Sequence, residues 1–161
     1  MDLLKWIISW SHIISATISI ITGAIVIFSK KGHLLHKKMG VVYFYAMLVN
    51  NIFALFIYNA RGKMFFPHWL AIIILVTIIP GYFVTRYKQF RYWLPIHIFC
   101  QIFSYYLLIG GAVNEVFLHI PKLRPLIING SPTIGITHFF VMIIFIIMLV
   151  YFLIKYRRKN K

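Results

Sequence analysis

Glu115 ends a long apolar run, Trp93–Phe117, that carries no other charge. An ionisable side chain within hydrocarbon is costly unless it is paired or wetted, so this lone carboxylate marks a candidate functional site. If the apolar runs are helices, which rise about 1.5 Å per residue, His12 and His138 lie about 9 Å and about 6 Å below the helix ends on the side of Glu115. Together the three residues could hold a divalent metal such as zinc or iron, with water as a fourth ligand.

A polar stripe runs back along the same segment. At about 100° per residue, six positions fall within roughly 40° of one helical line: Glu115, Gly111, Leu108, Ser104, Gln101 and His97. Such a stripe crosses most of a membrane and could relay protons or pass a small solute.

A second pair of histidines lies at the opposite end of the bundle. We expect His36 in the loop before the second apolar run, and His97 about one turn inside the fourth. Two neutral histidines on facing helices are a ligand set for b-type haem. Glycines on the neighbouring helices could admit its flat ring; they are Gly23, Gly110, Gly111 and Gly135.

The structural alternative to these sites is hydrogen bonding between helices without any ligand. For Asn50, Asn51, Ser19 and Ser104 we favour this alternative, since such groups commonly join membrane helices. For the outer histidines and Glu115 both interpretations stay open.

The elements that position these residues are membrane helices. The chain is 61% hydrophobic and 12% charged, whereas a soluble domain has roughly a quarter charged residues. Five apolar runs reach the roughly 17–25 residues needed to span a bilayer. We therefore expect one all-α transmembrane bundle over residues 1–161, in contact with the lipid bilayer, with the first four helices forming the core. The expected helices cover about 6–28, 39–58, 68–87, 93–117 and 134–154.

The basic residues predict the orientation of the chain. Of 17 lysines and arginines, twelve follow the first, third and fifth runs and five lie on the other side. The positive-inside rule then puts the N-terminus outside and the C-terminus in the cytoplasm. The net charge of +15 is explained by this asymmetry, so we expect no nucleic-acid partner. A membrane partner subunit or a homo-oligomer stays open.

Several catalytic classes are excluded by composition. The single cysteine, Cys100, excludes an internal disulfide and a thiolate metal cluster, and we expect it to be a small buried residue. One membrane carboxylate excludes a carboxylate dyad and a carboxylate-bridged di-iron site. The sequence has no zinc-protease, phosphate-loop or nucleophile-elbow motif.

Several short segments form a pattern along the chain. They are Ser11–His12 with Gly23, then Lys31-Gly32-His33 and His36-Lys37-Lys38-Met39-Gly40 leading into Val42-Tyr43, and His97 followed by Ser104-Tyr105. This pattern resembles a bacterial family of multi-pass membrane proteins catalogued as domain of unknown function 2306, over roughly His12 to Phe117. The resemblance implies a bacterial cytoplasmic membrane and directs attention to His12, His36 and His97. The family usually has a methionine one turn after the fourth-helix histidine; here Gln101 stands there, and we include it as a candidate cofactor contact.

The sequence thus predicts a small redox or metal-handling membrane protein that binds haem b or a divalent metal through intramembrane histidines. The cofactor candidates are His36, His97 and Gln101; the metal candidates are His12, Glu115 and His138. The alternative is a non-enzymatic transport, channel or complex-assembly subunit that uses the polar stripe. A structural subunit without a ligand comes third.

Overall fold

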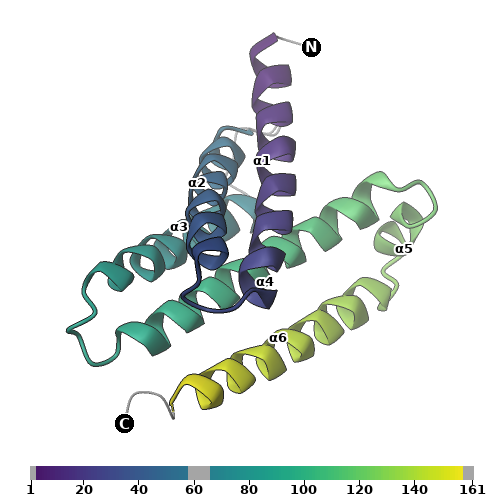
Figure 1. The fold of residues 1–161 in the computed structure, drawn as a ribbon. Helices are drawn as coiled ribbons and strands as arrows, with labels where there is room; N and C mark the ends of the chain where they lie inside the picture. The colour runs from purple at the N-terminus through teal and green to yellow at the C-terminus, as the bar shows by residue number, and fades with distance from the viewer. Residues whose placement is uncertain (1–2, 58–65, 158–161) are drawn as a thin grey trace.

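The computed structural model describes residues 3–57 and 66–157. Its long helices are α1 (Leu3–Phe28), α2 (Leu34–Phe56), α3 (Phe66–Phe83), α4 (Trp93–His119) and α6 (Thr133–Arg157), as Figure 1 shows. A 3-10 turn, η1 (Val84–Arg86), extends α3, and a short helix, α5 (Arg124–Ile128), connects α4 to α6. Within the described residues, five helices are long and apolar enough to cross a membrane, which confirms the predicted all-α membrane bundle.

The second helix begins earlier than predicted. We expected it to start near residue 39, but α2 starts at Leu34, directly after an extended His33. His36 therefore lies in the first turn of α2 and not in a loop. The exposed Lys37 and Lys38 do not end a helix, because long basic side chains can reach the headgroup layer while their backbone stays helical.

Other boundaries differ by smaller amounts. The third α-helix ends at Phe83 and continues as η1, where we expected helix to residue 87. The connection between α4 and α6, expected as a loop, contains α5. The predicted end of the second helix at Tyr58 lies outside the described residues.

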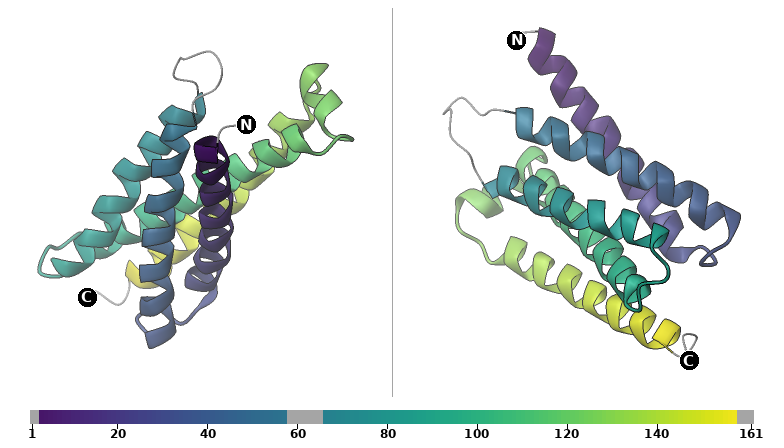
Figure 2. Two further views of the ribbon diagram at one scale, coloured as in Figure 1. Left: turned by 90° about the horizontal axis from the view of Figure 1, so that it is seen from above. Right: turned by 90° about the vertical axis from the view of Figure 1, so that its left-hand side faces the viewer.

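Each long helix packs mainly against its neighbour in the chain. α1 packs on α2, α2 on α3, α3 on α4 and α4 on α6, while α1 also touches α4. The right-hand view of Figure 2 shows α1 and α6 on opposite sides of the bundle. No residue of the spanning window of α6 is buried, so this helix lies at the outside of the bundle.

The core is formed by the first four helices, as predicted. Two ring pairs tie it together: Phe44 stacks on Tyr82 with ring centroids 4.0 Å apart, and Tyr43 meets Tyr105 edge-on at 6.2 Å. The buried cluster consists of Ile27, Tyr43, Phe44, Met47, Ile74, Ile78, Tyr105 and Leu108. Side chains of α6 pack against it from outside while staying partly exposed.

Gly23 allows the close approach of α1 to this core. A Cβ atom at this position would overlap the ring of Tyr105 and would meet Tyr43 at 3.0 Å. The Tyr105 ring is also held in place, because its hydroxyl donates a hydrogen bond to the Ile20 carbonyl at 3.0 Å. Gly23 is therefore required by packing.

We expect Gly23→Ala to lower the free energy of unfolding by about 1–3 kcal/mol, because overpacking forces rings from their positions. Thermal unfolding in mild detergent measures this change. Gly111→Ala is the matched control, since a Cβ there meets nothing within 4 Å; it should be neutral or stabilising, by up to about 1 kcal/mol. Equal melting temperatures for the two variants would contradict this account of α1 packing.

Candidate functional site

A cavity of about 440 Å³ lies at the basic end of the bundle. There the turn between α1 and α2, the segment from η1 to the start of α4, and the last turns of α6 come together, and all five long helices contribute lining residues. This volume falls in the range of about 300–1,000 Å³ typical of small-molecule and cofactor sites.

The two inner histidine candidates, His36 and His97, both line this cavity. His36 Nδ1 lies 3.2 Å from the Val26 carbonyl oxygen, and His97 Nδ1 lies 2.8 Å from the Gly81 carbonyl oxygen. A carbonyl oxygen can only accept, so each Nδ1 carries the proton and donates it. In the neutral ring, Nε2 then holds the lone pair that a metal ion or a proton donor would engage.

Neither Nε2 atom has a hydrogen-bond partner within the part of the chain that the structure describes. Ser29 Oγ, 3.4 Å from His36 Nδ1, adds a second contact on the same side of that ring. Both rings are thus oriented by their Nδ1 atoms, and Nε2 is the atom that remains available to a ligand.

Gln101 lines the same cavity one turn deeper than His97. Its position depends on Gly81, because a Cβ at Gly81 would collide with Cys100 and come within 3.2 Å of Gln101 Nε2. Cys100 is buried, as predicted for its role as a small packing residue. The structure thus brings together all three predicted cofactor residues.

Four basic side chains also line the cavity: Lys31, Lys37, Arg86 and Lys88. We predicted these residues as topology signals only and missed their place in the site. The sequence could have indicated their place in the site, because the same two loops that carry these charges flank His36 and His97. Lys31 has a structural role too, since its Nζ donates to the carbonyl oxygens of Val26 at 2.7 Å and Ile27 at 2.6 Å at the end of α1.

The polar stripe of α4 does not continue across the bundle. Beyond Gln101, Ser104 Oγ donates to the Gln101 carbonyl at 3.1 Å and therefore accepts from Tyr43 Oη at 3.0 Å. The next turn of each helix contributes an apolar side chain, Met47 from α2, Ile78 from α3 and Leu108 from α4, all within the buried cluster. This apolar barrier, formed by Met47, Ile78 and Leu108, separates the cavity from the polar residues nearer the other end.

The three metal candidates, His12, Glu115 and His138, have separate partners. His12 Nδ1 donates to the Asn50 carbonyl at 3.0 Å, and His138 Nε2 lies 2.9 Å from Asn114 Oδ1. Glu115 is 62% exposed and pairs at 3.1 Å with His119, one turn along the same helix. Among residues 3–57 and 66–157, no group of three His, Cys, Asp or Glu side chains could hold a metal ion, so the predicted three-ligand arrangement is not formed.

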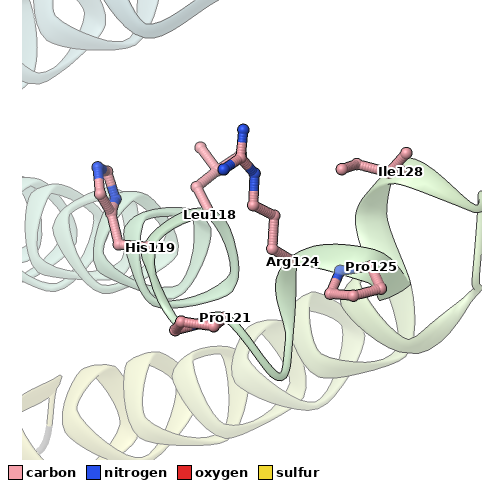
Figure 3. A pocket seen from close by; sticks show the side chains of 6 residues that line it. All are labelled: Leu118, His119, Pro121, Arg124, Pro125 and Ile128. Atoms are coloured by element: carbon pink, nitrogen blue, oxygen red, sulfur yellow. The ribbon is translucent and has the colours of Figure 1, made fainter.

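A second hollow, of about 450 Å³, lies at the corner between α4 and α5 (Figure 3). It is lined by Leu118, His119, Pro121, Arg124, Pro125 and Ile128, and every one of these side chains is exposed. It is a surface depression, and the cavity at the basic end, whose lining includes the buried residues Val26, Ile27 and Ile102, is the stronger candidate.

Comparison of the chain with models of known families, with curated proteins and with solved structures finds no match. The resemblance to the family named above therefore stays a prediction, and the functional argument depends on the cavity itself.

Burial, together with the nearby Lys155 ammonium group, lowers the pKa of Lys31 from 10.5 to about 8. Lys37, Arg86 and Lys88 line the same cavity. A base with a lowered folded-state pKa binds fewer protons than the unfolded chain between the two pKa values. Its contribution to stability therefore rises with pH between about 8 and 10.5.

Between pH 7.5 and pH 10, we expect the melting temperature of the ligand-free protein to increase by more in the wild type than in Lys31→Arg. The reason is that the pKa of Lys31 is lower in the folded protein than in the unfolded chain. Arginine stays charged throughout this range, so subtracting the two pH profiles removes the titration of all other groups. Parallel pH profiles for the two proteins would show that folding does not lower the pKa of Lys31.

Proposed function

We propose that this protein is an integral membrane protein that binds a haem-type cofactor, with haem b as the leading ligand, through His36 and His97. One observation carries the proposal: each histidine bonds a backbone carbonyl through Nδ1, and both line one cavity. That arrangement leaves two Nε2 atoms on different helices, which is the donor set of a b-type haem.

The rest of the cavity is compatible with this ligand. Apolar and aromatic side chains such as Trp93 and Ile98 form its walls, and Gln101 offers a polar contact beside the histidines. A Cβ at Gly40, which also lines the cavity, would meet nothing within 4 Å, so there is open space beside α2. Haem, when bound, supplies one-electron chemistry, while the histidines set its ligation.

Two competing functions receive less support. A three-ligand metal site is disfavoured by the separate partners of His12, Glu115 and His138. A proton or solute conduit along α4 is disfavoured by the apolar barrier, because Met47 and Ile78 are fully buried. We therefore propose binding, and not conduction, as the task of the inner polar residues.

We further propose that the protein resides in a bacterial cytoplasmic membrane with its N-terminus outside. The excess of basic residues at the end that contains the cavity supports this orientation. The cavity then opens toward the cytoplasmic face.

The haem proposal predicts an absorption spectrum. Protein purified in mild detergent and supplied with haem b should give a Soret band and split visible bands. His36→Ala and His97→Ala should each lose most of this signal, because a two-ligand site rarely survives on one ligand. His33→Ala is the matched control, since His33 is exposed and lies outside the cavity lining. Wild-type spectra from both cavity variants would refute His36 and His97 as ligands.

The orientation has its own test, in a Cys100→Ser background. Gln89→Cys and Asn129→Cys introduce single thiols at exposed neutral positions at opposite ends of the bundle. In intact cells, an impermeant thiol reagent should label position 129 and leave position 89 unlabelled until the membrane is opened. The reverse pattern would overturn the proposed orientation.

A further inference from the structure

The cavity lining carries an unbalanced positive charge. Lys31 comes from the turn between α1 and α2, Lys37 from α2, Arg86 from η1 and Lys88 from the turn before α4. None of the described residues that line the cavity is acidic, and Glu115 lies at the other end of α4. Four cations from separate segments therefore face one space without a described carboxylate beside them.

Three of the four cations lie near aromatic ring faces, and Lys31 also donates to the uncharged carbonyl oxygens of Val26 and Ile27. Lys31 Nζ lies 4.6 Å from the Phe152 ring centroid, and Arg86 Cζ lies 6.0 Å from that of Tyr82. Lys88 Nζ lies 5.9 Å from the centroid of Trp93. A ring face attracts a cation without neutralising it. The positive potential at the cavity is thus left available to an anion from outside the protein.

The charged and the apolar parts of the cavity lining differ in exposure. Lys37, Arg86 and Lys88 are exposed, whereas the apolar lining residues Val26, Ile27 and Ile102 are buried. An ionised acid in the apolar part would lose its hydration without compensation, which is costly. The complementary ligand is therefore an amphiphile with its acidic groups at one end.

We infer that Lys31, Lys37, Arg86 and Lys88 form a cationic collar that selects an amphiphilic ligand carrying two acidic groups and holds those groups at the basic end of the bundle. This inference rests on the proposed function, because it specifies which ligands the same cavity accepts. For haem b the acidic groups are its two propionates, while the histidines engage its iron. The collar acts on the acids and the histidines act on the metal, so the two contributions are separable.

The experiment uses the full chain in nanodiscs of uncharged phosphatidylcholine, with three probes. Haem b has both acids and iron; its dimethyl ester has iron but no acids; free-base protoporphyrin IX has the acids but no iron. The wild type should bind haem b about tenfold or more tightly than the ester, since charged hydrogen bonds are lost on esterification. Protoporphyrin IX should bind irrespective of His36→Ala or His97→Ala.

Two double variants, each of which removes two positive charges, test whether the preference for haem b over its ester depends on the cavity lining. Arg86→Gln with Lys88→Gln should abolish most of the preference for haem b over its ester. Lys30→Gln with Lys38→Gln removes the same charge from exposed positions outside the cavity lining and should keep the preference. Equal loss in both double variants would reduce the collar to a general surface charge that attracts acidic lipid, and would overturn the inference.

The remaining outcomes separate the two proposals. Equal affinity of the wild type for haem b and its ester overturns the collar but leaves histidine ligation standing if the spectra depend on His36 and His97. Protoporphyrin IX binding that needs Arg86 and Lys88, with no histidine-dependent haem spectrum, upholds the collar and refutes haem ligation. Failure of every probe to bind refutes both.

Discussion

The constraint on which this structure depends is that lipid offers no partner for a hydrogen bond. Several polar side chains within the bundle bond to backbone carbonyls, either on their own helix, as Ser19 does to Ser15, or across helices, as Tyr105 does to Ile20. His97 obeys the same rule through Gly81. This hydrogen bond gives the polar group a partner, and it also fixes the tautomer and the direction of the His97 ring. The candidate site therefore follows from the same requirement as the fold.

The sequence predicted the number and nature of the helices because a spanning segment must be long and apolar, and composition records both properties. The expected hydrogen bonding between helices is confirmed for Ser104, which bonds Tyr43 of α2. It is wrong for the described hydrogen bonds of Ser19 and Asn51, in which the side chains donate to carbonyl oxygens of their own helices. The predicted start of α2 was wrong. The positions of the charged residues indicate where the hydrocarbon layer ends, whereas a helix can continue into the headgroup layer.

The candidate site could be predicted only in part, because the sequence indicates the depth of a residue along its helix but not which helices are in contact. Depth alone correctly put His36 and His97 at one end. The same argument joined His12, Glu115 and His138, which have separate partners. In the structure Glu115 pairs with His119 one turn along α4 and lies at the surface. The cations were missed because each had a sufficient role in topology.

The apolar barrier of Met47, Ile78 and Leu108 has an electrical consequence. It confines the cavity to one end of the bundle, so a charge bound there traverses only a small part of the membrane field. A full crossing is worth about 2.3 kcal/mol per elementary charge per 100 mV, and a ligand at the edge experiences a small fraction of that energy. Occupancy of this cavity is therefore set by ligand concentration on one side of the membrane and is nearly indifferent to whether the cell is energised.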